Sequence, residues 1–214
     1  WINKARSSCE LRVFLFGASM KQTVIGLCGR KRVGKDTIAL RLVQDYGFVQ
    51  TSFAAPLKAG LAAMLEDYAH VAPASFESEH LKESPVPGLG DGTVTPRHLM
   101  VTLGTEWGRD LVAPDLWTKA LLNRLRSMSA RGHHFVVVSD VRFRNEAETL
   151  KAHGALLWHV TRPGFGGDNA HRSEQETLGD LCDAHIQNDG TVYDLAARVD
   201  NEIAMLHVTG KMPY

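Results

Sequence analysis

The sequence predicts an α/β fold in which helices cover both faces of a central parallel sheet, with a helical insertion and a lid added to it. Three observations predict this fold. Short apolar runs alternate along the chain with segments of helical periodicity. The first apolar run leads through a basic, glycine-bounded loop directly into a helix, and a later run ends in an aspartate, Asp140. A chain of 214 residues is long enough for one such domain with an insertion.

The first elements are a strand, a helix, a strand and a helix. Residues 23–28 form an apolar run typical of a buried strand, and residues 37–46 predict a helix that ends at Gly47. Residues 48–53 predict the second strand. The helix after it, at residues 56–68, carries a proline in its first turn, where proline is tolerated.

An excursion from the sheet follows. Residues 69–94 are rich in proline and glycine and contain no clear period, which is typical of an irregular insertion. Thr95 then precedes a proline, a pairing that favours the start of a helix at residues 97–111. Residues 115–130 predict another helix, which ends before Gly132.

The second half of the sheet begins with a β-branched run at residues 135–138, typical of a buried central strand. Residues 145–153 predict a helix and residues 155–160 the next strand, after which the glycine-rich stretch 162–169 suggests a flexible lid. The last elements are a helix at 173–181, a strand at 184–187, a turn at 188–190 and a helix at 192–206.

The loop at residues 29–37 has the spacing G-x-x-x-x-G-K of a nucleotide phosphate-binding loop. Gly29 and Gly34 allow a tight turn that brings backbone N–H groups to phosphate oxygens, and Lys35 adds positive charge at the helix start. Asp36 stands where the pattern has serine or threonine. A glycine-bounded surface turn is the alternative, but it would not need this lysine. The loop therefore predicts nucleoside triphosphate binding and a fold of the P-loop NTPase type.

Composition narrows the classes of partner. Lysine plus arginine and aspartate plus glutamate both number 24, so we expect no polymeric nucleic acid partner. No run reaches the length of a membrane span, so we expect no membrane partner. Three scattered cysteines indicate a reducing cytoplasm. Residues 1–19 precede the first methionine that fits a start, Met20, and we interpret them as an extension or a cloning remnant.

Asp140 is the leading catalytic candidate after the loop. Ligands bind at the carboxyl ends of strands in open α/β sheets, and an acid there often orders Mg²⁺ or contacts the second substrate. The alternative is that Asp140 caps the helix that follows it. The two roles are compatible.

Basic residues recur in loops and near predicted helix ends. Each alone is more often an ordinary surface charge. Together they would screen the repulsion between a triphosphate and an acceptor that is itself a phosphate. A monophosphate is mostly ionised at pH 7 and needs no base, which moderately favours such an acceptor. These residues are Lys31, Lys58, Arg97, Arg109, Arg142, Arg144 and Arg162.

Three weaker signals have plain structural interpretations. His171 lies in a polar loop and is more often solvated than catalytic in such a position. Trp107 and Trp117 could stack on a base, although tryptophans at helical spacing more often belong to the core.

With these features in hand, the chain resembles the deoxynucleoside monophosphate kinases of bacteriophages from about residue 23 to the final helix. The resemblance implies ATP-dependent phosphorylation of 2′-deoxynucleoside 5′-monophosphates with Mg²⁺, for DNA precursor synthesis, in the cytoplasm of the host if the protein is phage-encoded. A homodimer is left open. The ordered motifs that carry it are residues 29–37, 52–58, 97–106, Trp117, 139–146, Arg162 with Pro163, 171–174 and 188–190.

The resemblance also implies the site. We expect a single kinase domain at residues 20–214, with a substrate-binding insertion at 69–112 and a lid at 162–176. ATP is expected on Gly29, Val33, Gly34, Lys35, Asp36 and Thr37. The acceptor is expected on Lys31, Lys58, Arg97, Gly104, Thr105, Arg109, Trp117, Asp140, Arg142 and Glu146. Lys35, Asp140, Arg142 and Arg162 are the expected catalytic residues, and Asp36, Thr37 and Asp140 are the candidate Mg²⁺ ligands.

Two other functions stay open at this stage. A P-loop kinase for a hydroxyl acceptor, such as dephospho-coenzyme A or a hydroxymethylated base in DNA, would use Asp140 as its base. A nucleotide-binding switch would bind the triphosphate without acceptor-dependent turnover.

Overall fold

The structure is a computed structural model that describes residues 22–69, 71–165 and 178–212. Its centre is a sheet of five parallel strands in the order β2-β3-β1-β4-β5. The predicted parallel sheet is therefore confirmed. The strands are β1 (Thr23–Cys28), β2 (Val49–Thr51), β3 (Phe135–Val141), β4 (Leu156–Thr161) and β5 (Ala184–Gln187).

The central strand β1 is buried along its whole length, as its unbroken apolar run predicts. It pairs with β3 on one side, where Thr23 lies opposite Phe135, and with β4 on the other, where Ile25 lies opposite Leu156. The carboxyl ends of all five strands meet at one edge of the sheet, and the loops that could carry chemistry gather there.

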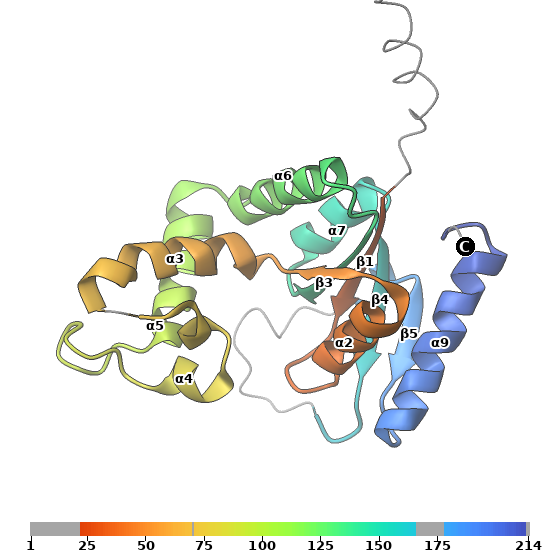
Figure 1. Cartoon of the computed structure of the whole chain (residues 1–214), viewed down its shortest axis with the longest axis horizontal. Helices are drawn as coiled ribbons and strands as arrows, with labels where there is room; N and C mark the ends of the chain where they lie inside the picture. The colour runs from red at the N-terminus through yellow and green to blue at the C-terminus, as the bar shows by residue number, and fades with distance from the viewer. Residues whose placement is uncertain (1–21, 70, 166–177, 213–214) are drawn as a thin grey trace, which may run out of the picture.

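Helices cover both faces of the sheet and make three layers (Figure 1). On one face, α2 (Lys35–Tyr46) and α9 (Val192–Val208) pack on the sheet through a core that contains Ile38, Trp158 and Val199. On the other face lie α6 (Leu116–Ala130) and α7 (Arg144–Ala152), whose core contains Leu121, Val138 and Leu150. The three-layer fold predicted from the alternation of elements is thus present.

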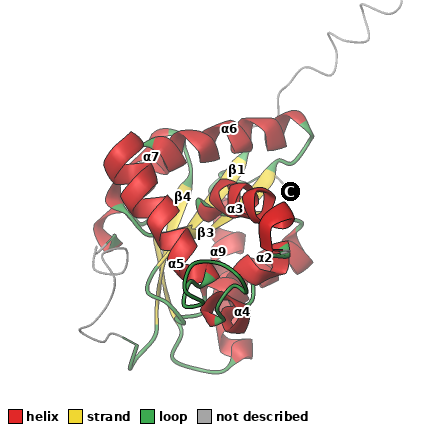
Figure 2. Cartoon of the chain, turned by 90° about the vertical axis from the view of Figure 1, so that its left-hand side faces the viewer, coloured by secondary structure: helices red, strands yellow, loops and turns green. Residues whose placement is uncertain are grey.

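A group of helices extends beyond one end of the sheet (Figures 1 and 2). They bury a core of their own, which includes Leu57, Phe76 and Val86 and reaches Trp117 of α6. The helices of residues 54–112, here named the insertion, therefore pack as one unit. Its helices are α3 (Ala54–Ala69), η1 (Pro73–Phe76), α4 (Glu79–Glu83), α5 (Pro96–Val101) and η2 (Thr102–Val112).

The prediction of one continuous helix at residues 97–111 is wrong, because two helices of different type occupy this stretch. The chain forms the short α-helix α5 and then the π-helix η2. Two side chains donate hydrogen bonds to the Gly104 carbonyl, Trp117 Nε1 at 2.7 Å and Arg109 Nη1 at 2.8 Å. A Cβ atom at Gly108 would lie 2.6 Å from Trp117 Nε1, so a glycine at this position leaves room for the Trp117 indole. These contacts suit the wider π-helical turn, which sequence periodicity does not reveal.

Other boundaries differ by a few residues. Strand β2 ends at Thr51 rather than at 53, because the N–H of Phe53 is bonded to Asp140. Helix α2 begins at Lys35, two residues earlier than predicted. Of the helix predicted at 173–181, residues 173–177 lie outside the described residues, and the rest contains the 3₁₀ turn η3 (Gly179–Leu181). None of the described helices combines the length and apolar character needed to cross a membrane.

Candidate active site

The loop between β1 and α2 depends on two glycines. Gly29 has a φ of 135° and Gly34 a φ of 110°, a region that other residues rarely adopt. A Cβ atom at Gly29 would lie only 2.3 Å from the carbonyl oxygen of Val160. The loop is therefore pressed against the end of β4, and it leads into the start of α2, where the first turn of a helix favours a negative charge.

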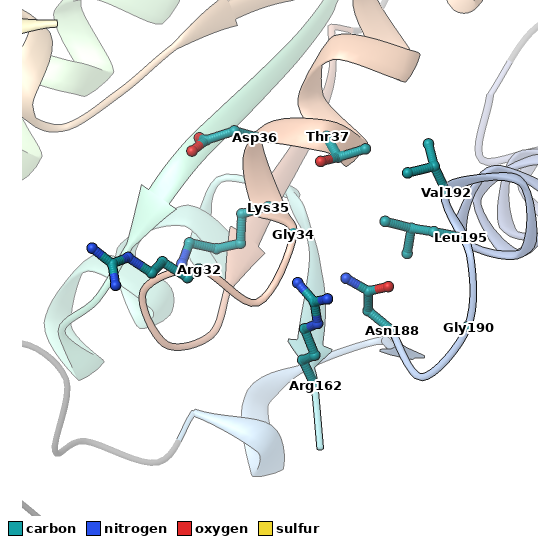
Figure 3. A pocket seen from close by; sticks show the side chains of 10 residues that line it. All are labelled: Arg32, Gly34, Lys35, Asp36, Thr37, Arg162, Asn188, Gly190, Val192 and Leu195. Carbon is teal, nitrogen blue, oxygen red and sulfur yellow. The ribbon is translucent and has the colours of Figure 1, made fainter. Parts of the chain in front are cut away.

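Lys35 is held over this loop. Its side chain is largely buried, with 9% of the residue exposed, and its ammonium group donates to the carbonyl oxygens of Gly29 at 2.6 Å and Arg30 at 2.7 Å. Figure 3 shows the side chain curling back along the loop from the first turn of α2. A positive charge is thus fixed beside the helix terminus, where it can act on a bound phosphate.

A cavity of ≈ 260 Å³ opens beside the loop. In Figure 3, Arg162 and Asn188 reach toward Gly34 from the ends of β4 and β5, and the apolar Val192 and Leu195 of α9 close the other side. The cavity therefore combines charged groups for phosphates with an apolar wall. Its lining residues are Arg32, Gly34, Lys35, Asp36, Thr37, Arg162, Asn188, Gly190, Val192 and Leu195.

Asn188 lines the cavity, although its position in the sequence indicated only a turn and part of a motif. Its Nδ2 donates to the Val33 carbonyl oxygen at 2.9 Å, and its backbone N–H donates to Thr161 at 2.7 Å. The amide thus ties the end of β5 to the phosphate-binding loop. A polar residue directly after a parallel strand was the available signal.

Asp140 connects the edge of the sheet to the insertion. Its Oδ1 accepts from the Phe53 N–H at 2.7 Å, and its Oδ2 accepts from the Ala54 N–H at 3.1 Å. The carboxylate therefore caps the start of α3. The alternative predicted that Asp140 caps the helix that follows it, but the helix that it caps is α3. At the start of α7, the N–H of the N-cap residue Phe143 donates to Glu146 instead.

Four of the expected acceptor residues form one connected group that joins η2 to α6 and α7. The indole N–H of Trp117, a residue only 8% exposed, donates to Gly104, and Arg109 joins the same carbonyl to buried Glu146. The neighbouring Thr105 is half-buried on η2. Trp117 accordingly packs as a core residue, while Trp107 is 46% exposed.

Carboxylates of residues 77–83, here named the acidic segment, pair with three of the expected acceptor cations. Glu79 bonds Lys31 of the phosphate-binding loop at 2.9 Å and Arg97 of α5 at 3.1 Å. Lys58 of α3 bonds Glu77 at 2.7 Å, and Arg97 also pairs with Glu83. The hydrogen bond with Lys31 is the main cause that lowers the pKa of Glu79 to about 2. The acidic segment thus gathers cations from three separate elements.

The remaining predicted residues lie at different places. Arg142 is exposed directly after the end of β3, whereas Arg144 pairs with Glu148 and Asp180 on the outside of α7. Asp36 and Thr37 line the cavity, but Asp140 does not. Within residues 22–69, 71–165 and 178–212, no three His, Cys, Asp or Glu side chains gather as a metal cluster. His171 lies outside the described residues, as do residues 166–176 of the lid predicted at 162–176.

Known proteins similar to this chain share one family description. The family model for deoxynucleotide monophosphate kinase matches residues 89–199. A putative deoxynucleotide monophosphate kinase of Acanthamoeba polyphaga mimivirus is 35% identical over 161 residues, 72% of this chain and 81% of that protein. The deoxynucleotide monophosphate kinase of Enterobacteria phage T4 is 25% identical over 86% of this chain and 99% of its own. A solved dephospho-CoA kinase from Campylobacter jejuni superposes with a TM-score of 0.49 at 14% identity, over 88% of this chain and 98% of that one.

Proposed function

The chain belongs to the deoxynucleotide monophosphate kinase family, and we propose on this premise that it transfers the γ-phosphoryl group of ATP to the 5′-phosphate of a 2′-deoxynucleoside monophosphate. One observation carries the proposal. Lys31 of the phosphate-binding loop is joined through Glu79 to Arg97 of the insertion, so the donor loop and a second group of cations lie side by side. Two neighbouring phosphate sites are what a kinase for a phosphate acceptor requires.

The donor site is formed by the loop and the cavity beside it. The N–H groups at the start of α2 and the Lys35 ammonium would bind the β- and γ-phosphates, with Arg162 facing them across the cavity. The apolar wall of Val192 and Leu195 suits a flat base. Oxygen ligands beside phosphates suit Mg²⁺, and Asp36 and Thr37 would hold it, where it would neutralise charge between the phosphates.

The acceptor site is formed at the junction of the sheet with the insertion. Lys31, Lys58 and Arg97 would bind the monophosphate, with Arg142 approaching from the end of β3. Gly104, Thr105, Trp117 and Glu146 belong to the wall that supports it. Because the acceptor phosphate is mostly ionised at neutral pH, its oxygen attacks in line without a protein base. Lys35 and Arg162 would stabilise the charge on the migrating group.

The direct test is a coupled assay of ADP release with dAMP, dGMP, dCMP and dTMP as separate acceptors. We expect at least one of them to stimulate release well above the ATPase background. Dephospho-coenzyme A and DNA serve as hydroxyl acceptors in the same screen, and the Lys35→Ala protein, purified identically, reports contaminating kinases. If no monophosphate stimulates release, the proposed function is wrong.

The acidic segment leads to a prediction about substrate affinity. Glu79→Gln is expected to lower the KM for the deoxynucleoside monophosphate by about two- to fivefold, because the acceptor phosphate then no longer competes with this carboxylate for Lys31 and Arg97. Exposed ion pairs of this kind contribute about 0.2–1 kcal/mol each, which sets the size of the effect. The measurement is the KM for the acceptor at saturating ATP and low ionic strength.

Glu66→Gln is the matched control, since Glu66 is an exposed glutamate on the same insertion unit. It should leave the KM for the acceptor unchanged. A higher KM in Glu79→Gln would mean that the acidic segment helps to organise the site rather than competing with the substrate.

A further inference from the structure

Arg109 has surroundings unlike those of the other basic residues near the acceptor site. Its guanidinium group is turned inward from η2, with 17% of the side chain exposed, and donates to Gly104 O at 2.8 Å and to Glu146 Oε1 at 2.6 Å. The same group stacks over the ring of Phe143, 4.2 Å from its centre. Arg109 thus contacts a carbonyl, a carboxylate and an aromatic ring of the protein, which together fix its planar fork in one orientation.

Glu146 passes this constraint on to the end of β3. Its side chain is only 2% exposed, and its Oε2 accepts the backbone N–H groups of Arg142 at 2.9 Å and Phe143 at 3.2 Å. These two residues follow the last residue of β3, Val141, and lead into α7. A continuous set of hydrogen bonds therefore runs from the π-helix of the insertion, through Arg109 and Glu146, to the backbone that carries Arg142.

The ionised form of the buried Glu146 carboxylate is stabilised by the neighbouring Arg109. Burial is the main cause that raises the pKa of Glu146 to about 7, and the nearby charge of Asp140 adds to the rise, whereas Arg109 and the two backbone N–H groups oppose it. Removing one partner of a buried ion pair leaves an uncompensated charge in the interior. Without Arg109, the carboxyl group would take up a proton, whose O–H competes with the two backbone donors.

Given the proposed kinase function on which this inference rests, we propose that Arg109 is a positioning residue: it holds Glu146, which fixes the backbone at residues 142–143 and thereby aims Arg142 at the acceptor phosphate. Arg109 itself does not bind the acceptor. The π-helical turn is the device that brings Arg109 into reach of Glu146, since the same turn presents the Gly104 carbonyl to the guanidinium group.

A double-mutant cycle tests the route of this effect. We expect Arg109→Ala to lower kcat/KM for the deoxynucleoside monophosphate by roughly ten- to hundredfold with little change in the KM for ATP. In a Glu146→Gln background the neutral amide no longer needs the cation. Adding Arg109→Ala there should cost at least about fivefold less than it does in the wild type. Arg109→Lys should restore part of the activity. Equal losses in both backgrounds would show that Arg109 binds the acceptor directly and would overturn the proposal.

Hydrogen exchange supplies a readout that does not depend on activity. Arg109→Ala should speed exchange of the backbone amides of Arg142 and Phe143, as measured by mass spectrometry on the peptide that contains them. Arg126→Ala, which removes an exposed arginine of α6, should leave that peptide unchanged. Unchanged exchange in Arg109→Ala would also overturn the proposal. If Arg109→Ala does not fold, Arg109→Gln takes its place in both experiments.

The two experiments separate this inference from the proposed function. If the wild-type protein phosphorylates no monophosphate, the function is wrong, while faster exchange in Arg109→Ala would still show that Arg109 fixes residues 142–143. If the wild type is active but the cycle is additive, the function stands and the positioning role of Arg109 is wrong.

Discussion

Lys35→Ala is expected to lower kcat for every accepted deoxynucleoside monophosphate by at least about a hundredfold to a thousandfold, the range typical for removal of one preorganised group that stabilises transition-state charge. Lys35 is the buried cation nearest to the start of α2, held in place by the carbonyl oxygens of Gly29 and Arg30. In the proposed donor site, charge would build up on the migrating phosphoryl group beside this ammonium group, which is already in place, whereas water would have to reorganise. The coupled ADP assay measures the loss.

The fold should survive this substitution. The two carbonyl groups that lose their donor belong to half-buried Gly29 and exposed Arg30, where water can reach them, so the unfolding free energy should change by no more than about 1–2 kcal/mol. Thermal unfolding followed by circular dichroism checks this. Lys119→Ala is the control, since Lys119 is an exposed lysine paired with Asp115 on α6. Activity near the wild-type level in Lys35→Ala would refute the assignment of the phosphate-binding loop.

Most of the fold could be predicted because its signals are local. The apolar run of β1 and the β-branched run of β3 each indicate a buried strand, and their alternation with helices indicates a parallel sheet. The phosphate-binding loop could be predicted for the same reason: its glycines and lysine are close together in the sequence, and its conformation depends on them.

The parts that could not be predicted depend on contacts between distant residues. Gly104 and Gly108 suggested no π-helix, because the reason for it is Trp117 and Arg109 bonding back onto one carbonyl. The lysines and arginines expected to bind the acceptor were recognisable as a set, but not their pairing with the acidic segment, whose carboxylates lie in the stretch with the least regular pattern. The sign of each charge can be read from the sequence, whereas the residue with which it pairs is known only once the fold is known.

Asp140 is the residue for which structure and sequence suggest two different roles, and Asp140→Asn is expected to separate them. Asparagine is a good capping residue, and its carbonyl oxygen can still accept one of the two N–H groups at the start of α3. The unfolding free energy should therefore fall by only about 1 kcal/mol. Turnover should fall by roughly tenfold to a thousandfold, because the negative charge that would order Mg²⁺ or contact the acceptor is gone.

Asp140→Ala completes the comparison, because it removes the cap and the charge together. It should lose as much activity as Asp140→Asn and about 1 kcal/mol more stability, since both N–H groups then lack a protein partner. Comparing the loss of activity with the loss of unfolding free energy in the two variants separates the two roles. If Asp140→Asn keeps nearly wild-type kcat/KM while Asp140→Ala is impaired in proportion to its instability, Asp140 acts only as the cap of α3. Binding of Mg²⁺ and acceptor would then fall to the loop residues and Arg142. If both variants lose activity alike, the carboxylate acts in the reaction as well as in the fold.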